Sequence, residues 1–253
     1  MTKDTIRQYT NLVAALTALT VNILSNTLPL NGLNTGDISD RFKVLFVPAG
    51  YVFAIWGLIY IGWIAFVIFQ FRPAQNQARR MQALGYWFAL SCVFNALWLF
   101  CWHYERFGLS VLVMLALLAT LIAAYLRLNV GRRNVPAAER WCVDVPFGLY
   151  LGWISVATVA NISDYLCSIG WNGFGLDPRS WAIIMLVVAS LLGLGMALTR
   201  RDVAFLSVLV WAFIGIAVKQ SAAASVANSA WAAALFALLL AIVSFTRRRR
   251  AFP

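Results

Sequence analysis

The sequence predicts an all-α, polytopic bundle of transmembrane helices, and two observations lead to this fold class. Of the 253 residues, 62% are hydrophobic and 11% are charged, against roughly 25% charged residues in soluble domains. The apolar residues form continuous runs that are long enough to cross a bilayer as helices. A membrane β-barrel would instead require alternating strands of about ten residues. Composition therefore excludes a soluble protein, and the continuous runs exclude a porin-like barrel.

Eight apolar segments reach, or nearly reach, the about 20 residues that a transmembrane helix requires. In chain order they are residues 6–28, 49–71, 84–102, 107–128, 141–167, 180–198, 203–218 and 222–245. The first is interpreted as a retained helix rather than a signal peptide, because its apolar part is too long and no convincing small-residue cleavage site follows it.

The basic residues predict a multi-pass protein of a bacterial-type inner (plasma) membrane with both termini in the cytoplasm. In this orientation fifteen Lys and Arg residues lie inside and five lie outside, as the positive-inside rule favours. The net charge of +11 is therefore interpreted as topology rather than as affinity for nucleic acid. The four arginines at residues 247–250 follow the last segment directly, which is typical of a stop-transfer anchor.

Polar and aromatic side chains from several segments fall at one depth, toward the outer side of the membrane. Asn22 lies in the first segment, Asn95 and Trp98 in the third, and Trp153 and Asn161 in the fifth. Buried amides in lipid need partners or a wet cavity, which favours a ligand pocket.

A second explanation for these residues stays open. Tryptophans gather at membrane interfaces as aromatic belts, which would account for Trp102, Trp141, Trp171 and Trp181 without any ligand. Asparagines also hydrogen-bond across helices as packing contacts. If the pocket exists, the loop at residues 29–48, rich in Asn, Gly and Asp, lies above it and is a candidate lid.

Three motifs carry a resemblance to a known family. They are PAGYVFAIWGLIY at residues 48–60, FNALW at 94–98 and VPFGLYLGWISVATVAN at 145–161. In this order they resemble the second-, third- and fifth-helix signatures of the tryptophan-rich sensory protein family, TspO/MBR. Its animal member is the translocator protein, or peripheral benzodiazepine receptor. The resemblance covers roughly the first 165 residues.

The resemblance implies a TspO-like five-helix bundle over residues 1–168. The remaining residues, 169–253, are then an additional three-helix membrane segment with a basic C-terminal tail. These last helices contain small-residue stretches, such as 221–225 and 232–234. Small residues let helices approach closely, so the stretches predict packing within the chain or a homodimer face.

The resemblance also implies a ligand pocket among the first, second, third and fifth helices. Family members bind porphyrins, haem, sterols or synthetic aromatic ligands there, so porphyrin or haem is the cofactor-like molecule indicated. Trp56 and Trp153 resemble the family's two pocket tryptophans. The candidate ligand-binding residues are Phe53, Trp56, Tyr60, Asn95, Trp98, Tyr150, Trp153 and Asn161.

Catalytic and metal-binding patterns are not evident in the sequence. The sole histidine, His103, follows Cys101 and Trp102 at the outer end of the third segment, where an interfacial role competes with haem ligation. The leading function is therefore a ligand-binding sensor or receptor for tetrapyrroles or related hydrophobic molecules. The alternatives are a small-molecule or lipid transporter, and an enzyme that degrades porphyrins with light through Trp56 and Trp153.

Overall fold

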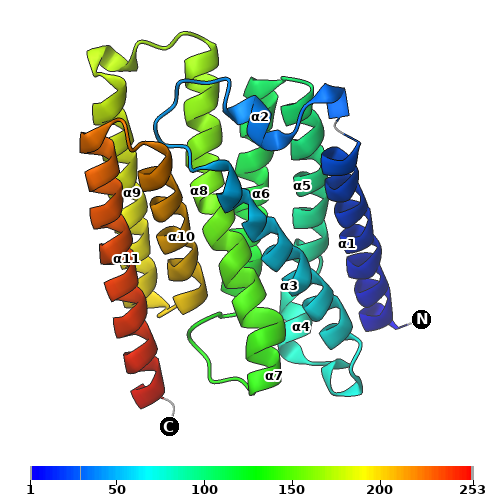
Figure 1. Ribbon diagram of the computed structural model, residues 1–253. Coiled ribbons are helices and arrows are strands. Elements are labelled where there is room, and N and C mark those ends of the chain that lie inside the picture. The colour runs from blue at the N-terminus through cyan, green and yellow to red at the C-terminus, as the bar shows by residue number, and fades with distance from the viewer. Residues whose placement is uncertain (1, 29, 252–253) are drawn as a thin grey trace. The chain divides into compact units, whose positions relative to one another are not determined.

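The computed structural model describes residues 2–28 and 30–251, and no β-strand occurs among them (Figure 1). Its long helices are α1 (Lys3–Thr27), α3 (Ile55–Gln70), α5 (Trp87–His103), α6 (Phe107–Arg127), α8 (Val145–Ser168), α9 (Pro178–Thr199), α10 (Val203–Lys219) and α11 (Ala224–Ala251). One long helix lies at each of the eight predicted segments. The predicted all-α fold class is confirmed.

Shorter helical elements join these helices. They are η1 (Leu30–Gly32), α2 (Thr35–Ser39), η2 (Gly50–Ala54), η3 (Pro73–Gln75), α4 (Arg79–Leu84), α7 (Ala137–Glu139), the π-helical η4 (Arg140–Asp144) and η5 (Gly173–Gly175). Because η2 runs directly into α3, and α7 and η4 run directly into α8, these pairs form longer continuous helical stretches.

Five helical stretches of the described part are long and apolar enough to cross a membrane. They are Gly50–Gln70, Phe107–Arg127, Ala137–Ser168, Pro178–Thr199 and Ala224–Arg247, and two shorter apolar helices are Trp87–His103 and Val203–Lys219. Helix α1 is not in this group, because its buried face carries polar residues that include Gln8, Asn11 and Asn22. The chain is a multi-pass membrane protein, and the count of eight crossings stays a prediction.

Side-chain acceptors begin three of the long helices. The Thr2 hydroxyl accepts from the Thr5 amide at 3.2 Å, Asp177 from the Arg179 amide at 2.9 Å, and Asp202 from the Ala204 amide at 3.0 Å. The first amides of a helix have no partner within it. These capping hydrogen bonds therefore stabilise the first turns of α1, α9 and α10 and define where each helix begins.

The chain forms two compact units. Unit 1 consists of Met1–Ile38 and Trp56–Leu151, and unit 2 of Ser39–Ile55 and Gly152–Pro253. Their limits differ from the division expected at residue 168, because the second part of α8 packs closely on α10. A Cβ on Gly152 would lie 3.1 Å from Val208 Cβ. Compact units are groups of contacts rather than separately folding domains, so the division into domains stays a prediction.

Unit 1 contains a buried ion network next to an aromatic core. Arg80 Nε donates to the Leu128 carbonyl at 2.7 Å, and its guanidinium pairs with Glu139 at 2.6 Å and with Asp144. The rings of Phe66, Phe88 and Phe147 form the adjoining core, with centroids 4.7 to 5.9 Å apart. One cation thus joins α4, the end of α6 and the start of α8.

Unit 2 is packed through small residues. Helix α11 buries a stripe of alanines, namely Ala227, Ala230, Ala234, Ala237 and Ala241, where it packs on α9 and α10. On α9, a Cβ at Gly193 would lie 2.7 Å from Leu209 Cδ1 of α10. The small residues of the last helices therefore serve packing within the chain, and the predicted homodimer stays a prediction.

Candidate functional site

Four aromatic rings of unit 1 lie in mutual contact. Trp56 and Tyr60 of α3 stack with centroids 5.7 Å apart, and Trp63 of the same helix lies 5.6 Å from Tyr60. Tyr150 of α8 meets Trp63 edge-on at 5.1 Å and Trp56 at 6.2 Å. Positions 56, 60 and 63 are spaced by four and three residues, so they share one face of α3.

A chain of hydrogen bonds attaches two asparagines to these rings. The Tyr60 hydroxyl donates to Asn22 Oδ1 at 2.6 Å, and Asn22 Nδ2 donates to Asn95 Oδ1 at 2.7 Å. Asn22 belongs to α1 and Asn95 to α5, and both side chains are buried. We call the four rings together with Asn22 and Asn95 the ring-and-amide cluster. It brings together residues of all four helices that were expected to supply the pocket, namely α1, α3, α5 and α8.

Three buried donors of the ring-and-amide cluster lack a well-formed hydrogen bond. Asn95 Nδ2, Trp63 Nε1 and the Tyr150 hydroxyl have none of good geometry among residues 2–28 and 30–251, and the Tyr150 hydroxyl interacts only more loosely with the side chains of Asn95 and Ser91. A buried donor without an acceptor costs about 1–3 kcal/mol, and lipid offers no acceptor in its place. The three groups are therefore suited to a molecule that brings oxygen or nitrogen acceptors.

Trp98, another predicted site residue, lies on α5 of the same unit. Its ring stacks on Trp102 at 5.7 Å with an interplanar angle of 21°. Trp102 Nε1 in turn donates to the Thr35 carbonyl at 3.1 Å. An interfacial belt was one open explanation for Trp102, but its side chain is buried and supports the loop before α3.

The other three predicted site residues lie in unit 2. The Phe53 ring of η2 meets the Trp153 ring of α8 edge-on at 5.6 Å. Trp153 and Asn161 are 2% and 3% exposed, so neither lies on a lipid-facing surface. The sequence predicted that these three residues and the five of unit 1 line one cavity. This stays a prediction.

His103 fastens the first part of the loop that was expected to act as a lid. Its side chain is buried, with Nδ1 3.1 Å from the Leu30 carbonyl and Nε2 3.1 Å from the Thr35 hydroxyl. Asn31 Nδ2 also donates to the His103 carbonyl at 3.0 Å. Both ring nitrogens are engaged by the protein, so His103 fastens the loop. Pro29 lies outside the described residues.

The second part of this loop is fastened within unit 2. The Ser39 hydroxyl donates to Asp164 Oδ2 at 3.2 Å, and Asp40 forms an ion pair with Lys219 of α10. The Ala49 amide donates to the Gly215 carbonyl at 3.1 Å. Lys219, at the end of α10, is thus a partner of the loop.

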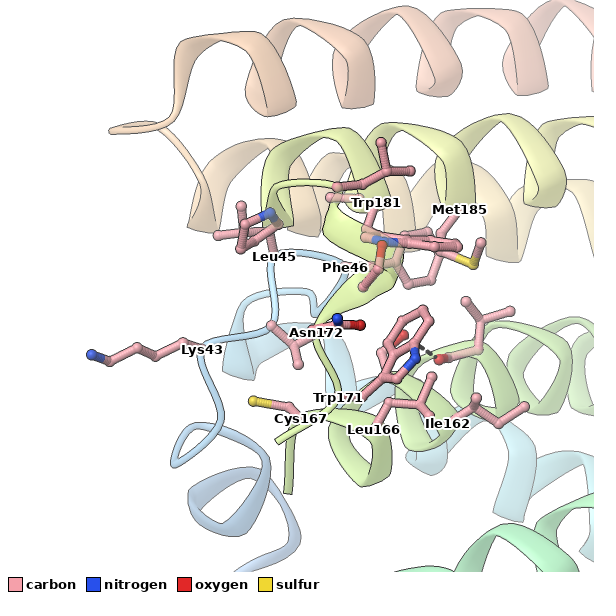
Figure 2. Close-up of a pocket in the computed structure, with 17 residues that line it drawn as sticks. Lys43, Leu45, Phe46, Ile162, Leu166, Cys167, Trp171, Asn172, Trp181 and Met185 are labelled. Atoms are coloured by element: carbon pink, nitrogen blue, oxygen red, sulfur yellow. Dashed lines mark hydrogen bonds between the residues drawn. The ribbon is translucent and has the colours of Figure 1, made fainter. Parts of the chain in front are cut away.

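A cavity in unit 2 involves residues that sequence reasoning did not select. It has a volume of about 480 Å³ and lies between the end of α8, the start of α9 and residues 43–46 (Figure 2). Trp171 and Trp181, assigned to an interfacial belt, form part of its wall. A signal for it was present in the sequence, because three glycines between residues 170 and 175 allow the chain to turn sharply between the two tryptophans.

Metal binding finds no support in the part of the chain that the structure describes. Within residues 2–28 and 30–251, no three His, Cys, Asp or Glu side chains are grouped closely enough to hold a metal ion. The chemistry that the described site offers is therefore stacking, apolar burial and hydrogen-bond donation.

A comparison with protein-family models gives a match to the TSPO-like protein family over residues 8–243. The chain belongs to this family. The resemblance carried by the three motifs is confirmed, and the match continues beyond residue 165 into the C-terminal helices of this TSPO-like protein. No curated protein and no solved structure matches the chain.

Proposed function

We propose that this TSPO-like protein binds a planar hydrophobic molecule of the tetrapyrrole class at the ring-and-amide cluster of unit 1. The observation that carries the proposal is the set of three buried donors, Asn95 Nδ2, Trp63 Nε1 and the Tyr150 hydroxyl, that make no well-formed hydrogen bond within the described residues. Buried polar groups inside a membrane protein need partners, and a bound ligand is one source of them.

A tetrapyrrole suits both properties of the cluster. Its flat macrocycle offers a large face for stacking on Trp56 and Tyr60, where aromatic pairs contribute about 0.5–1.5 kcal/mol beyond area burial. Its carboxylate oxygens supply acceptors for Asn95 and Tyr150. The contribution of Phe53, Trp98, Trp153 and Asn161 to the same ligand is proposed from the family motifs.

A fluorescence titration with a free-base porphyrin in detergent tests this proposal. Trp56→Ala should weaken porphyrin binding by about tenfold, which corresponds to about 1.4 kcal/mol. Trp141→Ala is the matched control in the same unit, because that side chain is 67% exposed. Equal losses in both variants would mean partitioning of porphyrin into the micelle. Unchanged affinity in Trp56→Ala would reject the site.

The same preparation separates binding from breakdown of the ligand. Illumination of the porphyrin complex in air should leave the porphyrin absorbance unchanged if the protein is a sensor or receptor. Loss of the spectrum in the wild type, but not in Trp56→Ala, would instead favour the light-dependent enzyme.

Transport is the second candidate function, and a buried carboxyl in α8 favours it. Asp164 is 1% exposed, and its Oδ1 has no hydrogen-bond partner within the described residues. Ionisable groups inside membrane spans often lie on substrate or proton pathways. Uptake of porphyrin into proteoliposomes that Asp164→Asn abolishes would favour transport. Binding of porphyrin without uptake in the wild type would favour the sensor function over transport.

The location of the site depends on topology, which we propose to be that of an inner-membrane protein with both termini in the cytoplasm. Cysteine labelling of intact cells tests this proposal. A cysteine at Asn34 should react with an impermeant reagent, and one at Ala251 should not. The opposite labelling pattern would mean that the loop containing Asn34 faces the cytoplasm.

A further inference from the structure

The cavity of unit 2 is a compact space at one end of the membrane spans, and we call it the α8–α9 cavity. Its wall includes Phe46 of the loop, Leu166 of α8, and Trp181 and Met185 of α9 (Figure 2). Its volume of about 480 Å³ falls within the roughly 300–1,000 Å³ of small-molecule sites. It lies within one compact unit and contains none of the residues of the ring-and-amide cluster.

Two tryptophans of this wall are held in place by the backbone. Trp181 Nε1 donates to the Gly173 carbonyl at 2.7 Å, and its ring lies 5.1 Å from that of Trp171. Gly173 has a φ of 65°, and a Cβ there would lie 2.8 Å from Trp181 Nε1. Only glycine fits this left-handed position without displacing the indole. The rings are therefore fixed beside the cavity and do not collapse into it.

The chemistry of the wall selects hydrocarbon. The hydroxyl of Ser163 is committed to the Val159 carbonyl at 2.8 Å, and Asn172 Oδ1 accepts from the Phe174 amide at 3.1 Å. Lys43 is the charged residue among those that line the cavity, and Figure 2 shows its side chain pointing away. A charged group would lose its hydration in this space and gain no counter-charge.

The position of the cavity indicates where its ligand comes from. Helix α9, which forms one wall, is itself a candidate span, and 22% of its most apolar stretch is buried. Acyl chains of the bilayer therefore lie beside the cavity.

We propose that the α8–α9 cavity binds a single hydrocarbon chain. The chain belongs either to a free fatty acid or to a membrane phospholipid, because both present the same methylene groups to this wall. The site goes beyond the proposed tetrapyrrole function and does not depend on it.

Quenching by brominated chains tests the site, because bromine quenches nearby tryptophans such as Trp171 and Trp181. One arm adds free dibromostearic acid to the full-length protein in nanodiscs, and the other replaces the phospholipid with one that carries a dibrominated chain. A fatty-acid site should give saturable quenching in the first arm. A phospholipid site should give quenching in the second arm beyond that of a variant with a filled cavity.

The filled-cavity variant is Ser163→Phe, and its matched control is Ser207→Phe. Both hydroxyls bind the carbonyl four residues earlier in their helix at 2.8 Å, but Ser207 is exposed on α10 and does not line the cavity. Ser163→Phe should raise the half-saturating concentration of fatty acid at least tenfold, or remove the excess quenching by phospholipid. Ser207→Phe should change neither. Equal quenching of both variants in both arms would overturn the proposal.

A second variant keeps the test decisive if Ser163→Phe does not fold. Trp171→Phe preserves an aromatic ring but removes one of the indoles beside the chain. The saturable quenching amplitude should fall in Trp171→Phe and stay unchanged in Trp141→Phe, whose indole belongs to unit 1. An undiminished amplitude in Trp171→Phe would reject the site. A porphyrin titration of the same variants, which should be normal, keeps this outcome separate from that of the tetrapyrrole proposal.

Discussion

Unit 1 and unit 2 are both rich in tryptophan, but they are organised by different forces. In unit 1, buried polar groups join the helices: Arg80 pairs with Asp144 and Glu139, and Asn22 links Tyr60 to Asn95. In unit 2, small residues let apolar segments pack closely. These residues are the alanines of α11 together with Gly193 and Gly215.

This difference separates two kinds of binding chemistry. Unit 1 retains donors that the protein does not satisfy, so it is suited to a ligand with acceptor atoms. The α8–α9 cavity of unit 2 has its hydroxyl and amide oxygen committed to backbone groups, so it is suited to hydrocarbon. The same residue type, tryptophan, contributes a stacking face in unit 1 and an apolar wall in unit 2.

The largest effect is expected from removal of the buried cation of unit 1. Arg80→Ala should cost about 3–5 kcal/mol, because the buried carboxylate of Asp144 and the partly buried one of Glu139 lose this guanidinium. Roughly 10 °C should be lost from the unfolding midpoint, measured by thermal unfolding in detergent. Arg79→Ala, at an exposed neighbouring position, is the control. A similar midpoint for both variants would contradict a polar organisation of unit 1.

In unit 2 the corresponding test is steric. A Cβ on Gly215 would overlap the Val52 side chain and lie 3.0 Å from Pro48 Cβ. Gly215→Ala should therefore cost about 1–3 kcal/mol of stability. Gly195→Ala, where no atom lies within 4 Å of the added Cβ, should be neutral or slightly stabilising. Thermal unfolding of the pair measures the difference, and equal midpoints would show that the close approach is unimportant.

Ligand binding should distinguish Trp153 from Trp181, two of the tryptophans of unit 2. Trp153→Ala should weaken porphyrin binding by about tenfold, or about 1.4 kcal/mol, if the family motif assigns it correctly. Trp181→Ala should leave porphyrin affinity unchanged while it reduces quenching by the brominated chain. Porphyrin titration of both variants provides the measurement. If Trp153→Ala binds normally, the tetrapyrrole site is confined to unit 1.

A smaller effect should come from the unsatisfied hydroxyl of Tyr150. Tyr150→Phe should keep most of its stability, because that hydroxyl makes no well-formed hydrogen bond within the described residues and interacts only loosely with Asn95 and Ser91. Porphyrin affinity should fall by roughly 2- to 10-fold, as one hydrogen bond is worth about 0.5–1.5 kcal/mol. Tyr60→Phe removes a hydroxyl that donates to Asn22 and should lose stability. A lower stability of Tyr150→Phe than of Tyr60→Phe would contradict the different roles given to the two hydroxyls.

The smallest effect concerns the cap of α9, next to the α8–α9 cavity. Hydrogen bonds from the Ser180 hydroxyl and from the Ser180 and Arg179 amides lower the pKa of Asp177 below its ordinary 3.8. The cap therefore contributes its full stability above about pH 4 and loses it as the pH falls through the lowered pKa. Fluorescence of Trp171 and Trp181 should follow this acid transition. Asp177→Asn, which still caps but does not titrate, should flatten it.

The sequence by itself determined the fold class, the helices and the family. These features follow from local properties: continuous apolar runs require helices in a bilayer, and motif residues lie within single helices. The amides that converge in unit 1 were also predictable in part, because buried Asn22 and Asn95 needed partners. Their spacing could place them on a helix face but could not pair Asn22 with Asn95, which lies 73 residues away.

The tertiary structure alone decided which aromatic and polar residues serve which purpose. His103 and Trp102 looked interfacial because their neighbours in sequence are polar, yet their partners are Leu30 and Thr35, about 70 residues earlier. Trp171 and Trp181 form a cavity wall because Gly173 takes a left-handed conformation and accepts an indole hydrogen bond. Such contacts depend on how distant segments pack, which hydrophobic periodicity does not encode.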